Sequence, residues 1–169
     1  MISRVATAVA VVFAVTAAAT AGPLPVWAYR VTPGPQLIHP NYDGESFLTN
    51  PGTGPGNQGW LDFHTTSGSG LRGAQVIRLA GLGTREYVTT RDAGTWIGFN
   101  DPYSLTLSLQ DGTTGQVGSV SISGRVGGDF TADTMALTSV FLGPASQELT
   151  LGDTRYVVSV AKFVAPNGR

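Results

Sequence analysis

The chain lacks cysteine altogether, and it has only two histidines and few charged side chains, which make up 12% of its 169 residues. The absence of cysteine excludes disulfides, thiolate catalysis, cysteine-based zinc sites and covalent haem attachment. A domain of this length still buries enough apolar surface to fold without disulfides. Lysine and arginine are scattered along the sequence, so we expect no nucleic-acid partner and no basic patch for anionic membranes.

Segments with the 3.6-residue apolar period of a surface helix are also missing. What recurs is alternation of apolar and polar residues between turn residues, which is typical of strands. Residues 103–111 and 118–126 alternate in this way around a glycine-containing turn at 111–115, which predicts an antiparallel hairpin. Residues 154–163 carry apolar side chains on both faces, which predicts a central strand. Weaker strand candidates are residues 27–31, 36–38, 46–49, 61–66, 86–90, 95–99, 139–142 and 148–151, while 75–82 fits either a strand or a short helix.

These patterns predict one all-β domain over residues 22–169. Short strands separated by turns, with almost no helix, favour an antiparallel β-sandwich of the immunoglobulin-like or jelly-roll kind. The Gly/Pro-rich stretch 33–59 has little periodicity, so we expect a long, mostly irregular excursion there.

The first 28 residues have the three-part pattern of a secretory signal peptide. Arg4 supplies a positive charge, an uncharged apolar run follows, and small residues then allow cleavage after Ala21 or after Ala28. We favour Ala21, because residues 27–31 fit a strand that the fold would keep. We therefore expect a signal-peptide helix over residues 1–21. The alternative, an uncleaved membrane anchor, is disfavoured because the run is shorter and richer in alanine than a span of roughly 20 residues.

Two stretches, 54–59 and 68–73, match the G-x-G-x-x-G motif of dinucleotide-binding proteins. The second one follows a predicted strand and has Glu86 and Asp92 downstream at a suitable distance. The chemistry requires a helix N-terminus aimed at a pyrophosphate, and residues 74–82 are too short and glycine-bounded to form that helix. We interpret both motifs as turn glycines and expect no cofactor.

His39 and His64 are the only histidines. A zinc site would require them to converge with a carboxylate such as Asp43 or Asp62, and no G-x-S-x-G elbow marks a serine nucleophile. We therefore predict no catalytic residues and no metal site, and we expect the two histidines not to approach each other.

Several aspartates stand beside glycine, proline or threonine. One interpretation is calcium binding in extracellular loops, but no D-x-D-x-D-G spacing is present. We favour the other interpretation, in which the carboxylates accept hydrogen bonds within turns. The residues concerned are Asp43, Asp101, Asp111, Asp129, Asp133 and Asp153.

The large aromatic side chains are the remaining candidates for ligand binding. Trp27 and Trp96 fit an inter-sheet core, where aromatic residues dominate burial. Trp60 follows Gly59 within the glycine-rich excursion, and we expect it to be the least buried of the three tryptophans. Trp60 and Tyr42 are therefore the candidate ligand-binding residues, as planar rings for stacking on a sugar.

The C-terminal half contains strand-and-turn patterns at residues 101–107, 111–120, 149–158 and 163–166. Through these motifs, residues 87–166 resemble an uncharacterised family of secreted bacterial β-sandwich proteins, many of which carry a C-terminal PEP-CTERM sorting tail. The resemblance implies secretion, but the sorting tail is not found in this sequence. The family carries no established activity that could be assigned to a residue here.

We therefore expect a secreted, non-enzymatic module, extracellular or periplasmic, that acts structurally or by interaction at the cell surface or in the matrix. The alternatives are a carbohydrate-binding module and, third, a secreted hydrolase. An extracellular protein or a polysaccharide is the expected kind of partner. Because related proteins continue with a further strand, we also expect an open sheet edge that self-associates or accepts a strand from a partner.

Overall fold

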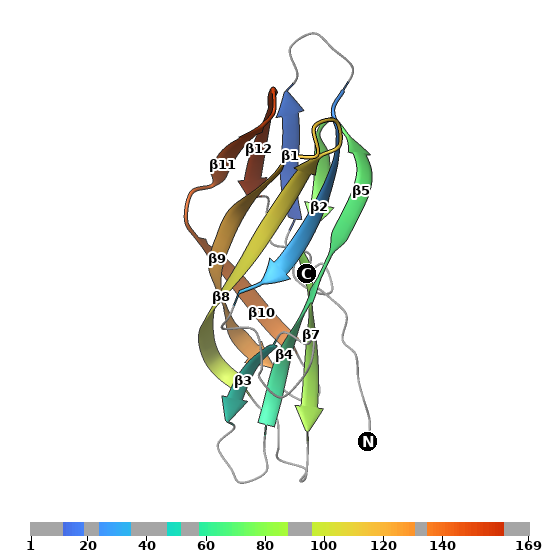
Figure 1. The fold of residues 1–169 in the computed structure, drawn as a ribbon. Helices are drawn as coiled ribbons and strands as arrows, with labels where there is room; N and C mark the ends of the chain where they lie inside the picture. Colours follow the sequence, from blue (N-terminus) through green and yellow to red (C-terminus); the bar gives the residue numbers. More distant parts are fainter. Residues whose placement is uncertain are drawn as a thin grey trace.

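The computed structural model describes residues 12–18, 24–34, 47–51, 58–87, 96–130 and 135–160, and these residues form strands and turns without a helix. The strands build three antiparallel sheets (Figure 1), in the orders β11-β12-β1-β6, β10-β9-β8-β2-β5 and β3-β4-β7. We call them the four-stranded, the five-stranded and the three-stranded sheet. Their strands are β1 (Val12–Ala18), β2 (Val26–Pro33), β3 (Phe47–Pro51), β4 (Gln58–Thr65), β5 (Ser67–Arg72), β6 (Gln75–Arg78), β7 (Ala80–Tyr87), β8 (Trp96–Asp111), β9 (Val117–Phe130), β10 (Met135–Leu142), β11 (Ser146–Leu151) and β12 (Thr154–Val160).

The hairpin predicted from alternation is confirmed as β8 and β9, which are longer than expected at their far ends. Their register pairs Leu107 with Val120. The connecting turn places Gly115 at a φ of 71°, a left-handed conformation that glycine adopts without steric cost. The apolar face of the hairpin is buried, whereas its polar serines and threonine are half-buried on β8 and exposed on β9, as the period of two predicts.

The central strand predicted near the C-terminus is also confirmed over the described residues. β12 lies between β11 and β1, and Tyr156 and Val158 on one of its faces are buried. On the other face Val157 is half-buried, which explains why the sequence carries apolar residues on both sides.

One long hairpin contributes strands to all three sheets. β4 and β7 pair in the three-stranded sheet at the lower end of Figure 1. Beyond Thr66 and Leu79 the two sides of the hairpin separate. β5 pairs with β2 in the five-stranded sheet, whereas β6 pairs with β1 in the four-stranded sheet. We call this point the fork. The segment 75–82, which fits a strand or a short helix by sequence, therefore forms strands on both sides of Leu79.

The fork is held by backbone hydrogen bonds and by burial. The Thr66 amide donates to the Leu79 carbonyl at 3.1 Å, and the Val31 amide donates to the Thr66 carbonyl at 2.9 Å. The Thr66 hydroxyl donates to the Arg78 carbonyl. Leu79 is fully buried. At the tip of the hairpin, the Trp27 indole N–H donates to the Gly73 carbonyl at 3.0 Å.

Residues from all three sheets share one buried core, as their burial in a single cluster shows. Trp27 is fully buried, as expected for a core tryptophan. The core consists of Trp27, Val31, Phe63, Ile77, Leu79, Ala80, Tyr103, Leu105, Leu107, Leu109, Val120, Ile122, Val126, Leu151, Tyr156 and Val158.

Two tyrosines lie over glycines of neighbouring strands. A Cβ at Gly124 would come 2.6 Å from the Tyr103 ring, and a Cβ at Gly68 would come 2.6 Å from the Tyr29 ring. Each glycine pairs with its tyrosine's strand, so the ring covers the bare backbone of the neighbouring strand. These contacts explain why glycines occur inside two strands, where a side chain would normally be favoured.

The N-terminal segment differs from its prediction. Residues 12–18, which the leader pattern places in a signal-peptide helix, form strand β1 between β12 and β6. The segment contains β-branched Val12, Val15 and Thr16, which favour strands once neighbouring edges are available. No helix in the described part of the chain is long and apolar enough to cross a membrane.

The Gly/Pro-rich stretch 33–59 is described only in part. Its residues 47–51 form β3, which agrees with the strand candidate at 46–49. Residues 35–46 and 52–57, including the candidate at 36–38, lie outside the described residues.

We expect Leu107→Ala to lower the free energy of unfolding by about 2–5 kcal/mol, because truncation of a fully buried leucine leaves a cavity. Leu142→Ala removes the same atoms from a side chain that is 49% exposed, and it should cost about 1 kcal/mol or less. Urea unfolding of the two variants measures the difference. A Leu107→Ala protein as stable as the wild type would contradict the core face assigned to β8.

Candidate functional site

The structure describes the predicted ligand-binding residues only in part. Trp60 lies in β4, the middle strand of the three-stranded sheet, where its backbone pairs with Thr49 of β3 and with Arg85 of β7. Tyr42 lies outside the described residues. The pairing of these two residues as a sugar platform therefore stays a prediction.

The histidines and the glycine motifs can be placed more fully. His64 is exposed on β4, and His39 lies outside the described residues. Among the described residues no group of three or more His, Asp or Glu side chains could hold a metal ion. The motif at residues 68–73 belongs to β5 and to the bend after it, and strand β6 follows instead of the helix that pyrophosphate binding requires. The interpretation as turn glycines is confirmed for Gly73, which lies in the bend, whereas Gly68 and Gly70 lie within β5.

The most concentrated polar contacts in the described structure surround Asp111, at the end of β8. Its Oδ1 accepts hydrogen bonds from the Thr113 amide at 2.9 Å, from the Thr114 amide at 2.7 Å and from the Thr114 hydroxyl at 3.1 Å. This is the side-chain acceptor role within a turn that the sequence predicts for its aspartates. The carboxylate thereby closes the turn between β8 and β9.

The other oxygen of the same carboxylate connects two sheets. Asp111 Oδ2 accepts a hydrogen bond of 2.7 Å from the hydroxyl of Tyr156 on β12. Asp111 is 1% exposed and Tyr156 is fully buried. A buried carboxylate without donors would be strongly unfavourable, so the four hydrogen bonds are what allows this charge inside the core.

The pKa values of the pair follow from this arrangement. Burial raises the pKa of Asp111, but the hydrogen bonds from the turn and from Tyr156 outweigh burial and bring it below its ordinary value of 3.8. Burial and the hydrogen bond to the Asp111 carboxylate raise the pKa of Tyr156 well above its ordinary value of 10. At neutral pH the carboxylate is therefore charged and the tyrosine is a donor.

Two further polar contacts connect the same sheets. The Gly152 amide, in the turn between β11 and β12, donates to Gln116 Oε1 at 2.7 Å. Gln147 Nε2 on β11 donates to the Ser121 carbonyl on β9 at 2.8 Å. Together with the Asp111–Tyr156 bond, these contacts fix β11 and β12 against the turn and the strands of the β8–β9 hairpin.

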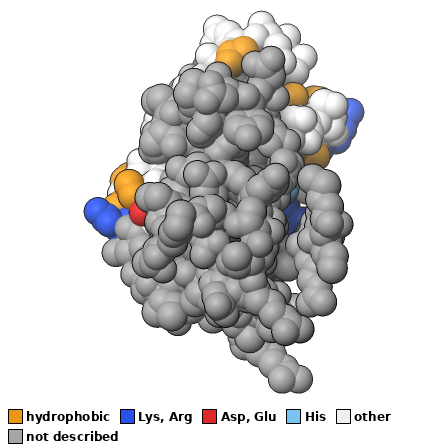
Figure 2. Space-filling model, turned by 90° about the horizontal axis from the view of Figure 1, so that it is seen from below, with side chains coloured by type: hydrophobic (Ala, Val, Ile, Leu, Met, Phe, Trp, Pro, Cys, Tyr) orange, Lys and Arg blue, Asp and Glu red, His pale blue; other side chains and the backbone are white. Residues whose placement is uncertain are grey.

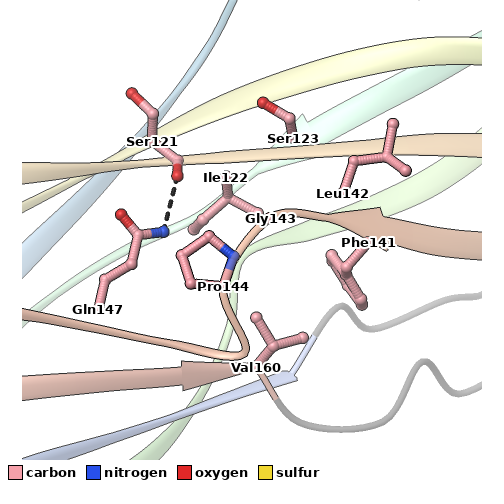
Figure 3. A pocket seen from close by; sticks show the side chains of 9 residues that line it. All are labelled: Ser121, Ile122, Ser123, Phe141, Leu142, Gly143, Pro144, Gln147 and Val160. Carbon is pink, nitrogen blue, oxygen red and sulfur yellow. Dashed lines mark hydrogen bonds between the residues drawn. The ribbon is translucent and has the colours of Figure 1, made fainter.

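A hollow lies beside the Gln147 contact, between the ends of the two sheets (Figure 3). Phe141 and Leu142 of β10 and Val160 of β12 line its apolar side, and Gln147 lines its polar side. Its volume of about 20 Å³ is enough for one water molecule and far below the volume of a typical ligand pocket. The hollow is therefore too small to hold a substrate molecule.

The edge of the five-stranded sheet carries exposed apolar side chains. β10 is the edge strand of the five-stranded sheet, and its Val140 and Leu142 are 60% and 49% exposed. Figure 2 shows the described hydrophobic side chains of the lower face in separate small groups, with basic side chains on opposite sides of the view. An apolar sheet edge is a typical place for pairing with another chain.

Sequence reasoning recognised Asp111 as a turn former but missed Tyr156 as its partner. The two residues are distant in sequence, and Tyr156 reads only as an apolar position of a strand. The one available signal was an aspartate at the end of a strongly alternating strand, where a charge next to a core demands a donor.

Comparison with known proteins gives no relative. No family model, no characterised protein and no solved structure matches the chain significantly. The resemblance to secreted β-sandwich proteins therefore stays a prediction.

We expect Tyr156→Phe to lower the free energy of unfolding by about 1–3 kcal/mol, because the variant leaves a buried carboxylate oxygen without its donor. Glu148→Gln is the matched control. It weakens an exposed ion pair with Arg155 on the same strand pair and should leave the unfolding midpoint unchanged. Chemical unfolding measures both, and equal midpoints for wild type and Tyr156→Phe would contradict the structural role of the bond.

The Asp111–Tyr156 pair predicts that the stability of the fold decreases at both low and high pH. The folded pKa of Asp111 is lowered, so its contribution to stability is present above pH 3.8 and is lost as the pH falls further. The folded pKa of Tyr156 is raised, so its contribution is present below pH 10 and is lost as the pH rises further. The stability difference between wild type and Asp111→Asn should therefore shrink in acid, and that between wild type and Tyr156→Phe in alkali. Denaturant unfolding at a series of pH values checks this, and differences that do not vary with pH would refute it.

Proposed function

We propose that the protein is a secreted, non-enzymatic β-sandwich, of the immunoglobulin-like or jelly-roll kind, that acts as a structural or interaction module at the cell surface or in the extracellular matrix. In this proposal the five-stranded sheet is one layer, and the sheet that contains β11, β12 and β6 is the other. Their shared buried core and the Asp111–Tyr156 bond between them support the arrangement.

The observation that carries the interaction role is the edge of the five-stranded sheet. Strand β10 presents its outer backbone edge together with exposed Val140 and Leu142. Soluble proteins usually prevent pairing at such an edge with lysine, proline or a bulge. The exposed valine and leucine of β10 instead favour pairing with another chain. The proposed partner is an extracellular protein or a polysaccharide.

A carbohydrate-binding module is the second candidate. Trp60 occupies the middle strand of a sheet and pairs with Thr49 and Arg85, so polar residues flank an aromatic position on both sides. Flat aromatic rings beside hydrogen-bonding groups are suited to sugar recognition.

Expression of the full chain in a bacterial host with an export pathway tests secretion. We expect the exported product to have the mass of residues 22–169, which shows cleavage after Ala21. Cleavage after Ala28 would correct the boundary, and a full-length product that stays in the cytoplasm would refute the proposal.

The exported product then allows a test of the interaction role. We expect it to be retained by a cell-wall and matrix fraction, and the double variant Val140→Lys/Leu142→Lys to lose that retention by about tenfold or more. Val117→Lys, at a side chain that is 63% exposed on another strand, is the control and should be retained normally. Loss of binding to insoluble polysaccharides in Trp60→Ala, with the β10 double variant unaffected, would favour the carbohydrate-binding candidate instead.

A further inference from the structure

Strand β1 occupies a place that another chain could fill. It pairs with β12 over residues 13–18 and with β6 over residues 12–15, antiparallel to both. Figure 1 shows β1 beside β12, close to the upper end of the molecule. The same residues lie inside the proposed signal peptide, so cleavage after Ala21 would remove the strand. We call the space that it leaves between β12 and β6 the β1 slot.

The β12 wall of the slot is fixed without β1. The hydroxyl of Tyr156 donates to buried Asp111 of the five-stranded sheet at 2.7 Å. β11 pairs along the other side of β12, and the Gly152–Gln116 contact holds their turn at 2.7 Å. These contacts involve no residue of β1.

The β6 wall is fixed independently as well. Its chain continues at one end through Gly73 into β5, where the Trp27 indole donates to the Gly73 carbonyl at 3.0 Å. At its other end it continues into the fork, where the Thr66 hydroxyl donates to the Arg78 carbonyl. Ile77 between them is 5% exposed and belongs to the core. The two walls therefore stand one strand apart, each with a hydrogen-bonding edge directed at the other.

We propose that in the secreted protein the β1 slot receives an extended segment of a partner protein, which completes the four-stranded sheet as its third strand. The inference rests on the proposed secretion, because only cleavage of the leader empties the slot. An empty slot exposes two strand edges and part of the core, and strand addition satisfies both at once.

The strand register of β1 shows which side chains a segment needs in order to fit the slot. Positions 13, 15 and 17 of β1 lie opposite Val160, Val158 and Tyr156, and position 13 also lies opposite Ile77. Of these neighbours Tyr156, Val158 and Ile77 are buried, so the incoming strand needs uncharged, apolar residues at every second position. The intervening positions lie opposite half-buried or exposed residues and tolerate polar side chains. β1 itself, with Phe13, Val15 and Ala17 in those places, has the required sequence pattern.

A cut made after folding tests the proposal on the complete chain. A specific protease site is placed between Ala21 and Gly22, the full-length protein is folded and cut, and a fluorescent peptide of residues 11–19 is added in excess. We expect the labelled peptide to replace the cut segment and bind saturably with one site per molecule. The uncut protein should bind at least about tenfold more weakly, because its own β1 competes from the same chain.

Two peptide variants make the matched control. Val15→Asp places a carboxylate opposite buried Val158 and should weaken binding by more than about tenfold. Thr16→Asp makes the same change at the neighbouring position, opposite half-buried Val157, and should bind within about threefold of the parent peptide. Hydrogen exchange of residues 155–160 and 75–78 should slow when the parent peptide binds.

The outcomes separate this proposal from the proposed secretion. Three outcomes would each overturn the proposed slot. The two aspartate peptides could bind equally, the parent peptide could bind cut and uncut protein equally, or the four-stranded sheet could unfold when the cut segment leaves. An exported product that forms dimers, which the peptide then dissociates, would identify a second copy as the occupant and overturn the assignment to a different protein. A leader that stays uncleaved in cells would overturn the proposed secretion and, with it, the filling of the slot by a partner. Saturable peptide binding after the artificial cut would then show only that the space between β12 and β6 accepts a strand.

Discussion

A single buried carboxylate holds the two larger sheets in register with each other. Asp111 closes the turn of the β8–β9 hairpin with one oxygen and binds Tyr156 of β12 with the other. Apolar packing between sheets is non-directional and would tolerate sliding, whereas a charged hydrogen bond inside the core tolerates neither sliding nor rotation. The apolar core is non-directional, and this bond adds a directional contact between the two sheets, beside those of Gln116 and Gln147.

The fork solves a different problem, which is how two strands of one sheet each continue into another sheet across a single residue. Thr66 and Leu79 are each the single residue between two strands, and beyond them β5 and β6 join different sheets. Because the strands on either side are continuous, the three-stranded sheet is an extension of both larger sheets. This arrangement also holds β6 in place independently of its neighbour in the four-stranded sheet.

The sequence predicted what depends on local periodicity. The β8–β9 hairpin and β12 were identified because their alternation reports burial directly. β5 was missed because Ser67–Arg72 contains two glycines and no alternation, and because its neighbour β2 is far away in sequence. β1 was assigned to a helix because an uncharged run of alanine and valine suits a leader and a buried strand equally well. The Asp111–Tyr156 contact was missed for the same reason as β5, since nothing local records a partner on another sheet.

The place of β1 in the sheet also orders events in time. Phe13 pairs with Val160, which lies far along the chain, so Phe13 is synthesised long before its partner. Closing so long a loop is slow and entropically costly, and the four-stranded sheet is completed only after β12 has left the ribosome. Throughout that interval β1 lacks its β12 neighbour, and of its two partner strands only β6 has been synthesised. Under the proposed secretion, the segment acts as a leader before β12 exists to pair with it.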